Sequence, residues 1–312
     1  MATTPSVKLH RPSLLSKFFY ELSLWRDYLE LTKPKVVALM LITTVIGMRL
    51  ATLDPIPLSL FITALFGISL SMGGAAAINH VVDHKIDTLM ARTSKRPVAT
   101  GKIGNTKALL FATGLCLISL LILEVFVNRL TAVLTFSGMV GYAVIYTFYL
   151  KRATPQNIVI GGLAGALPPL LGWTAVTNEI HPHALLLVLI IFVWTPPHFW
   201  ALAVAKKEEY AKAKIPMLPV THGIDFTKTS ILLYTWLLAA VSYLPFIAQM
   251  TGLFYTLSVT LLNAVFLYYA TRLKWMPLEA PHKSKIAMQM FGYSIIYLFA
   301  LFIALLIDHL WL

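Results

Sequence analysis

The chain alternates long apolar stretches with short polar connections from residue 36 almost to its end. Each stretch is nearly free of charge and is close to the roughly 20 residues that a helix needs to cross a bilayer. The pattern therefore predicts an all-α, polytopic membrane protein with nine transmembrane helices. The predicted spans are 36–53, 58–80, 108–126, 132–150, 157–176, 183–205, 229–250, 254–271 and 287–307.

The composition agrees with this pattern. Hydrophobic residues make up 58% of the 312 residues and charged residues only 12%, about half of the roughly one quarter that is usual in soluble domains. A disordered chain and a water-soluble enzyme are both excluded. Residues 1–30 are polar and mixed, without the apolar core and small-residue cleavage site of a signal peptide. We therefore expect a cytoplasmic N-terminal arm at 1–30 and a single transmembrane domain at 31–312.

The net charge of +12 has an uneven distribution along the chain. With the N-terminus in the cytoplasm, 23 of the 25 Lys and Arg residues fall on the inner side, and only Arg49 and Arg129 fall on the outer side. Such a bias follows the positive-inside rule, which sets the orientation of membrane proteins. The basic character is thus explained by the lipid bilayer and its anionic headgroups, with a further contribution from an anionic substrate, and it requires no nucleic acid.

A polar cluster directly follows the second predicted span. Asn79, Asp83 and Asp87 are spaced i, i+4, i+8, and this spacing drifts by only about 40° per step on an α-helix, so the three side chains share one face. Two carboxylates and an amide oxygen form a hard-oxygen site that suits Mg²⁺. The alternative is a solvated helix end, with the acids paired to Lys85 or Arg92. The metal site is favoured because ionisable groups that continue a membrane face are costly unless they are functional.

Three cations, Arg92, Lys95 and Arg96, follow this acidic face. Cations so close behind carboxylates suit a metal–diphosphate complex, whose phosphate oxygens an arginine can hold in a fork geometry. The alternative is positive-inside topology alone, which is strongest for Lys95. No GxxxxGK[ST] or GxGxxG sequence occurs in the chain, so a nucleotide is not indicated.

Two later spans contain helix-breaking residues. Residues 161–169 combine Gly161, Gly162 and Gly165 with Pro168 and Pro169, which favours a broken or closely packed helix. The sixth span contains the sequence WTPPHFW at 194–200. A histidine inside a membrane helix is a functional candidate. The alternative for this histidine is a hydrogen bond to a carbonyl that the preceding prolines leave free.

Several blocks of sequence resemble the haem O synthases (protohaem IX farnesyltransferases), a branch of the UbiA intramembrane prenyltransferases. The Asn-x3-Asp-x3-Asp face alone resembles UbiA proteins in general. The blocks at 194–202 and 215–220 are specific to the haem branch, and the similarity covers about residues 27 to 300. The blocks are 31–35 (LTKPK), 90–97 (MxRTxxRP), 146–157 (YTxxLKRxTPQN), 161–173 (GGxAGAxPPxxGW), 194–202 (WTPPHFWAL) and 215–220 (IPMLPV).

The resemblance implies a nine-helix bundle in the bacterial cytoplasmic (inner) membrane that uses Mg²⁺. Its activity is transfer of a farnesyl group from farnesyl diphosphate to a vinyl group of haem B, which gives haem O and diphosphate for terminal oxidases. It leaves open a downstream haem-modifying enzyme or oxidase assembly factor as a partner. The implied residues are Asn79, Asp83, Asp87 and Lys151 for catalysis, Arg92, Lys95, Arg96, Tyr146 and Arg152 for diphosphate, His198, Trp194 and Trp200 for haem, and Asn79, Asp83, Asp87, Glu208 and Glu209 for metal.

The sequence departs from the family pattern at two places. Many relatives carry a second Asp-x3-Asp motif after the sixth span, where this chain has Lys206-Lys207-Glu208-Glu209-Tyr210, and His84 stands where the family has arginine. Two alternatives follow. A prenyltransferase acting on an aromatic quinone precursor would have a stronger second acidic motif and no need of His198. A transporter of an anionic lipid would have charge on both faces, whereas the outward loops are nearly bare.

Overall fold

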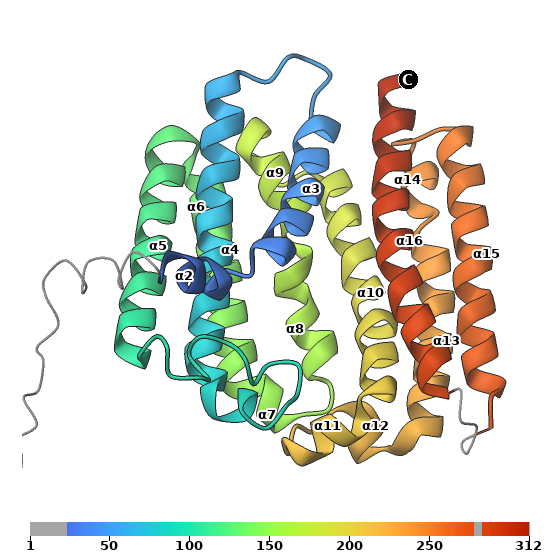
Figure 1. The fold of residues 1–312 in the computed structure, drawn as a ribbon. Coiled ribbons are helices and arrows are strands. Elements are labelled where there is room, and N and C mark those ends of the chain that lie inside the picture. The colour runs from blue at the N-terminus through green and yellow to red at the C-terminus, as the bar shows by residue number, and fades with distance from the viewer. Residues whose placement is uncertain (1–23, 278–282, 312) are drawn as a thin grey trace, which may run out of the picture.

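The computed structural model describes residues 24–277 and 283–311, and every regular element within these residues is a helix. Figure 1 shows the long helices standing side by side, with α4, α5 and α6 at one edge, α15 and α16 at the other, and α3, α8, α9 and α10 between them. The all-α architecture predicted from the apolar pattern is confirmed. The helices α10, α13, α15 and α16 pack on one another, and α4 packs on α5.

In the part of the chain that the structure describes, eight helical segments are long and apolar enough to cross a membrane by themselves. A ninth arises if α2 (Trp25–Leu31) and α3 (Pro34–Leu50), which are bent by 51° at residues 32–33, form one span. The eight segments are α4 (Leu58–Asp87), α5 (Asn105–Phe126), α6 with η1 and α7 (Arg129–Ala153), α8 with α9 (Asn157–Thr177), α10 (Pro182–Ala205), α13 with α14 (Gly223–Ile247), α15 (Leu253–Trp275) and α16 (Lys283–Trp311, counted from Ser284).

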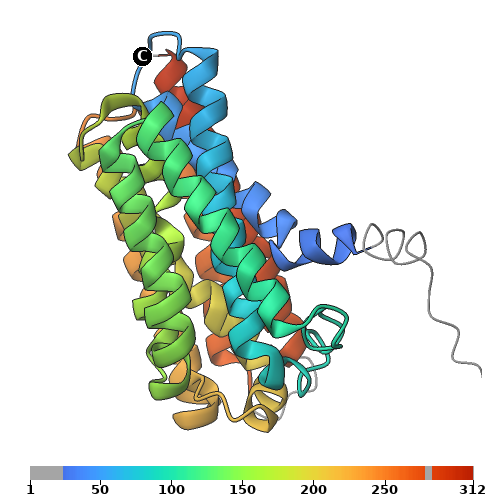
Figure 2. The same ribbon diagram turned by 90° about the vertical axis from the view of Figure 1, so that its left-hand side faces the viewer.

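The helix α2 runs crosswise to the long helices and projects from the side of the bundle, as the turned view shows (Figure 2). It contains residue 30, the predicted end of the N-terminal arm, so that boundary falls inside a helix. Trp25 and Leu29 are 56% and 46% exposed. An exposed aromatic and an exposed aliphatic side chain on a crosswise helix suit the interface between water and lipid.

The longer connections gather at one end of the bundle (Figure 1). This end carries the 88–104 connection, α7 (Lys151–Ala153), α11 (Lys207–Lys212) and α12 (Leu218–Thr221). The opposite end carries the short 51–57 connection and the C-terminus. Most of the polar chain outside the spans is thus concentrated at the end that the charge bias predicts to be cytoplasmic.

The glycine- and proline-rich fifth span is both broken and closely packed, as predicted. The helix α8 (Asn157–Ala166) ends before Leu167, and α9 (Pro168–Thr177) begins with two prolines at its first turn. A Cβ on Gly172 would lie 2.0 Å from the Thr44 carbonyl oxygen, so only glycine lets α9 approach α3 this closely. This contact fixes α3, and with it the residues immediately before α3, against the middle of the bundle.

Candidate functional site

The three residues of the acidic motif lie on one buried face at the end of α4. Asn79, Asp83 and Asp87 are 5%, 0% and 3% exposed. Asn79 Nδ2 donates a 2.8 Å hydrogen bond to Asp83 Oδ2, which joins two consecutive turns of the helix. The shared face predicted from the i, i+4, i+8 spacing is therefore present. A solvated helix end is excluded because a solvated carboxylate would be exposed.

Two cations from other segments pair with these carboxylates. Lys151, at the start of α7, lies with its Nζ 2.5 Å from Asp83 Oδ2. Arg96, in the 88–104 connection, places one guanidinium nitrogen 2.8 Å from both oxygens of Asp87. The acids thus pair with Lys151 and Arg96 instead of with Lys85 or Arg92. Because both carboxylates are buried, each needs such a partner to remain charged.

A third cation, Lys33, completes the cluster. It lies between α2 and α3, and its Nζ donates a 2.8 Å hydrogen bond to Asn79 Oδ1. Its backbone is left-handed, with φ +51° and ψ +58°, a conformation that costs a non-glycine residue about 1–2 kcal/mol. Lys33 belongs to the 31–35 block quoted above, but no role was predicted for it. The sequence gives little indication of such a role, because a lysine before a proline is common at the start of a helix.

The opposite wall of the site comes from η1 (Gly141–Leu150), a π-helix. The rings of Tyr142 and Tyr146 stack with centroids 5.7 Å apart. The Thr147 hydroxyl donates to the Tyr142 carbonyl, five residues earlier, and lies 3.4 Å from Asn79 Nδ2. A Cβ on Gly161 would lie 2.2 Å from the Tyr146 ring. The ring of Tyr146 is thus held against the backbone of α8, beside the acidic face.

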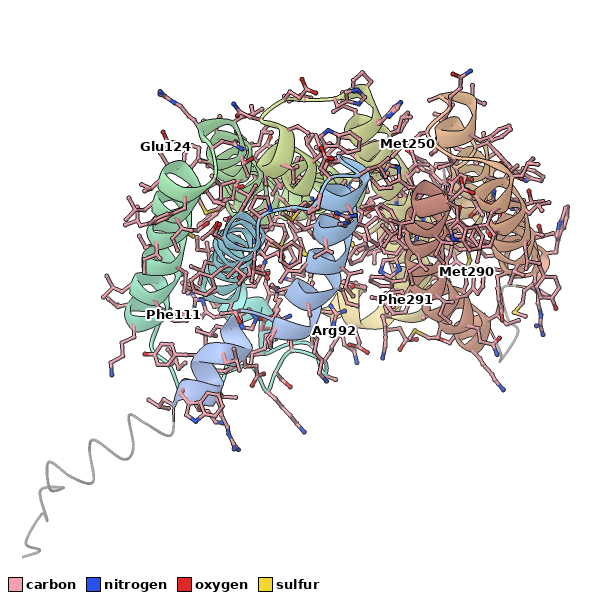
Figure 3. The ribbon with its side chains drawn as sticks, turned by 90° about the horizontal axis from the view of Figure 1, so that it is seen from above. Arg92, Phe111, Glu124, Met250, Met290 and Phe291 are labelled. Atoms are coloured by element: carbon pink, nitrogen blue, oxygen red, sulfur yellow. The ribbon has the colours of Figure 1, made fainter. Side chains whose placement is uncertain are left out.

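The other predicted diphosphate residues lie further out. Arg92 and Lys95 are exposed, and the Arg152 guanidinium donates a 3.3 Å hydrogen bond to the Val82 carbonyl on α4. Their exposure keeps them available to a ligand without placing them on the acidic face. Arg92 is labelled in the view from above (Figure 3).

The second acidic pair is not joined to the first. Glu208 is exposed on α11, and Glu209 pairs with Lys206 at 2.8 Å. Within residues 24–277 and 283–311, no three His, Cys, Asp or Glu side chains are close enough to hold a metal ion. Glu208 and Glu209 therefore do not form one cluster with Asp83 and Asp87 in the described residues.

The predicted haem residues separate into two groups. His198 lies between the rings of Trp194 and Phe291, with centroid distances of 4.2 and 4.5 Å. Its Nδ1 is 2.6 Å from the Ser294 hydroxyl on α16, so its partner is not a carbonyl freed by the prolines. Trp200 instead contacts Tyr234 edge to face, away from this stack. Phe291 (Figure 3) and Ser294 were not predicted as neighbours of His198, because they lie more than 90 residues later in the chain.

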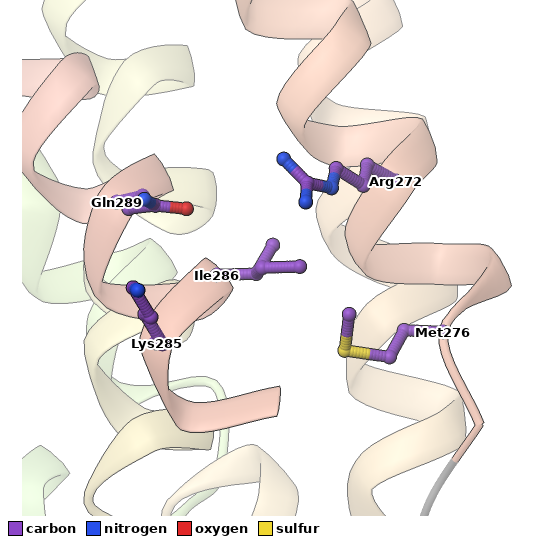
Figure 4. A pocket seen from close by; sticks show the side chains of 5 residues that line it. All are labelled: Arg272, Met276, Lys285, Ile286 and Gln289. Atoms are coloured by element: carbon purple, nitrogen blue, oxygen red, sulfur yellow. The ribbon is translucent and has the colours of Figure 1, made fainter. Parts of the chain in front are cut away.

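A pocket and a groove lie outside the acidic face. A pocket of about 260 Å³ between the ends of α15 and α16 is lined by Arg272, Met276, Lys285, Ile286 and Gln289 (Figure 4). A wholly apolar groove of about 440 Å³ lies between α3 and α16. It begins at Ala38, five residues after Lys33, which is a rise of roughly 7.5 Å along a helix. The groove therefore lies along the helix that follows Lys33.

The oxygen-rich face suits a divalent cation. Asp83 Oδ1 is buried and has no hydrogen-bond partner, a costly arrangement unless a ligand uses that oxygen. With Asp87 and the Asn79 amide, the face offers the hard oxygens that Mg²⁺ prefers. The residues present thus fit a magnesium ion shared with a phosphate-bearing ligand.

Solved structures share this architecture. A structure described as that of digeranylgeranylglyceryl phosphate synthase is 20% identical, with a TM-score of 0.75, and the match covers 92% of this chain and 99% of that one. A UbiA homologue from Archaeoglobus fulgidus, bound to GPP and Mg²⁺, is 16% identical with a TM-score of 0.61, and the match covers 89% and 99% of the two chains. These similarities establish the fold.

Curated relatives are far closer in sequence. A protoheme IX farnesyltransferase 2 from Pseudoalteromonas atlantica is 61% identical over 285 residues, which cover 91% of this chain and 92% of the relative. The protoheme IX farnesyltransferase of Shewanella oneidensis is 58% identical over 288 residues, covering 92% and 94%. The family model of the UbiA prenyltransferases matches residues 40–307. The chain therefore belongs to the UbiA prenyltransferase family.

Proposed function

We propose that this protein transfers a farnesyl group from farnesyl diphosphate to the outer carbon of a vinyl group of protohaem IX. A water molecule adds to the inner vinyl carbon and loses a proton, and the products are haem O and diphosphate. The single observation that carries the proposal is a buried, charged site of Asp83, Asp87 and their cations inside an apolar helical bundle. Such a site suits a substrate with a diphosphate head and a hydrocarbon tail. The relatives named protoheme IX farnesyltransferase support farnesyl and haem as the two substrates.

In this proposal Asn79, Asp83 and Asp87 would hold Mg²⁺ together with the diphosphate. When bound, the ion would neutralise the charge that develops on the leaving diphosphate. Lys151 and Arg96 lie beside the same carboxylates and contact the phosphate oxygens. Arg92, Lys95 and Arg152 add positive charge around them. Glu208 and Glu209 would hold a second metal ion together with phosphate oxygens of the same ligand.

The allylic carbon then reacts while shielded from water. The apolar groove between α3 and α16 offers the isoprenoid tail a hydrophobic surface on the helix that follows Lys33. The stacked Tyr142 and Tyr146 rings stabilise a developing allylic cation through their faces. Between α10 and α16, Trp194, His198 and Phe291 form a stack of three aromatic rings, and we place the porphyrin beside this stack. Trp200 faces elsewhere and supports α13.

The protein is proposed to lie in the bacterial cytoplasmic membrane with its charged end inward. Both substrates then reach the site from the cytoplasm or the inner leaflet. The haem product passes to a haem-modifying enzyme or to oxidase assembly.

The test is a direct assay. Purified protein is incubated with haem B, isotope-labelled farnesyl diphosphate and Mg²⁺, and the haems are analysed by mass. The expected product is haem carrying the labelled farnesyl group. The same assay with 4-hydroxybenzoate in place of haem tests the quinone-precursor alternative. Prenylated benzoate without prenylated haem would overturn the proposal.

A further inference from the structure

The cations of the site are held on the same oxygen atoms that a metal would use. The motif has five side-chain oxygens: Asn79 Oδ1, both oxygens of Asp83 and both of Asp87. Lys33 engages the first, Lys151 and Asn79 Nδ2 engage Asp83 Oδ2, and Arg96 engages both oxygens of Asp87. Of these five oxygens, only Asp83 Oδ1 is without a partner. A metal ion alone therefore meets one free ligand atom.

The orientation of the Asn79 amide follows from its neighbours. Lysine can only donate hydrogen bonds and a carboxylate can only accept them, so Asn79 must turn its oxygen to Lys33 and its nitrogen to Asp83. In this orientation the amide oxygen is unavailable to a metal. The left-handed backbone of Lys33 also supports a specific role for this residue. Strained backbone conformations persist where the surrounding structure holds them, and they are concentrated at functional sites.

The sum of the charges in the site also disfavours a metal ion that binds alone. With all three side chains protonated, Lys33, Lys151 and Arg96 outnumber the two carboxylates, and the cluster then carries a net charge of about +1 that repels a lone divalent cation. A prenyl diphosphate brings about three negative charges near neutral pH, because its terminal phosphate loses a second proton near pH 6. Adding the diphosphate with one divalent ion brings the sum close to zero. Either ligand alone leaves a buried charge imbalance.

We propose that Lys33, Lys151 and Arg96 exchange partners in concert, so that the metal and the prenyl diphosphate bind as one unit. The three cations leave the oxygens of Asn79, Asp83 and Asp87 for phosphate oxygens, and the motif oxygens become free for the metal. Lys33 is a positioning residue in this exchange, because it decides which atom Asn79 presents. The inference rests on the proposed function only in taking a prenyl diphosphate as the ligand.

The test measures binding, not turnover. Mn²⁺ replaces Mg²⁺, and free Mn²⁺ is followed by electron paramagnetic resonance with and without farnesyl thiodiphosphate, which does not ionise readily. Wild-type protein is expected to bind Mn²⁺ at least tenfold more tightly with the analogue. By reciprocity, Mn²⁺ must tighten analogue binding by the same factor. Equal Mn²⁺ affinity with and without the analogue would overturn the inference.

The variant Lys33→Met distinguishes a positioning role of Lys33 from a purely structural one. It should bind Mn²⁺ alone several-fold more tightly than wild type, bind the analogue alone more weakly, and show a smaller coupling factor. The matched control is Lys35→Met, two residues along the chain and exposed, which should keep the wild-type coupling. A Lys33→Met protein that loses affinity for Mn²⁺ alone contradicts the exchange. Lys151→Met provides the second variant and should change the same three quantities in the same directions.

The outcome is independent of haem chemistry. Coupled binding without haem prenylation would refute the proposed substrate and leave the exchange intact. Haem prenylation with uncoupled binding would refute the exchange alone. If Mn²⁺ and the analogue together do not bind, both fail.

Discussion

Lys33 Nζ and Asn79 Oδ1 form a 2.8 Å hydrogen bond between residues 46 positions apart in the chain. The bond joins the bend between α2 and α3 to the end of α4 that carries the acidic motif. The crosswise helix at the membrane edge and the candidate metal site are therefore mechanically connected. Movement of α2 would displace Lys33, because only Thr32 separates the two, and would thereby change the hydrogen bond to Asn79.

Loss of one buried charge should abolish turnover without unfolding the protein. Asp83→Asn keeps the shape of the side chain but removes the charge that faces Lys151. Loss of metal-borne charge stabilisation costs several kcal/mol of barrier, so turnover should fall by about three orders of magnitude or more. The measurement is haem prenylation by purified protein. Asp54→Asn, on an exposed outward loop, is the matched control, and near wild-type turnover in Asp83→Asn would refute the metal assignment.

The pair between Arg96 and Asp87 should behave as a coupled unit. Arg96→Gln leaves the buried Asp87 carboxylate without its partner, which should lower the free energy of unfolding by about 3 kcal/mol. Adding Asp87→Asn removes that stranded charge, so the double variant should regain much of the stability and none of the activity. Thermal unfolding in detergent and the prenylation assay measure the two quantities. Lys85→Gln, an exposed neighbour two residues before Asp87, should leave both quantities close to their wild-type values.

The position of the Tyr146 ring can be tested through a glycine. A Cβ at Gly161 would overlap this ring at 2.2 Å, so Gly161→Ala should cost about 1–3 kcal/mol of stability and displace the ring from the site. Gly165 lies one turn further along α8, and a Cβ added there would have no neighbouring atom within 4 Å. Gly165→Ala should therefore be neutral or slightly stabilising because alanine favours helix. Equal effects of the two substitutions would show that Tyr146 is not held this way.

The orientation in the membrane is a prediction from charge. A cysteine at Ser94, in the 88–104 connection, should react with an impermeant reagent in inverted vesicles and not in intact spheroplasts. A cysteine at Asp54 should show the opposite pattern. The native Cys116 is buried, so it should give little background. Labelling of the Ser94 position from outside would reverse the topology and the side from which substrates arrive.

The fold was largely predictable because its signals are local. Hydropathy marks the spans, and a spacing of four residues puts Asn79 and Asp83 on one face whatever surrounds them. The break before Pro168 follows from the chemistry of proline. The π-helix at Gly141–Leu150 was not predictable, because its apolar sequence suits an α-helix equally well. Its wider turn is stabilised by contacts such as the Thr147 hydrogen bond to the Tyr142 carbonyl.

The partners within the site were less predictable than its acids. Nothing in the spacing of Lys33, Arg96 and Lys151 shows which oxygen each contacts, since they come from separate segments that only packing brings together. The same applies to Phe291 and Ser294 around His198. For Glu208 and Glu209 the sequence pattern is clear, but it does not show that Glu209 pairs with Lys206.

The role of His198 decides how haem is held. Its ring is packed between Trp194 and Phe291, and its Nδ1 meets the Ser294 hydroxyl. A hydroxyl that orients one ring nitrogen fixes where the other points, which is the usual support of a histidine that binds a metal. We therefore expect Nε2 to bind haem iron, for which histidine is a common axial ligand.

His198→Gln should then lower haem affinity by at least tenfold and shift the Soret band, with farnesyl thiodiphosphate binding unchanged. Ser294→Ala should weaken haem binding less, because the ring keeps its two aromatic neighbours. His183→Gln, at the other end of the same helix, is the control and should leave the spectrum as it is. A purely structural His198 would give a different pattern: His198→Gln would lower the melting temperature while the Soret band and haem affinity stayed at their wild-type values.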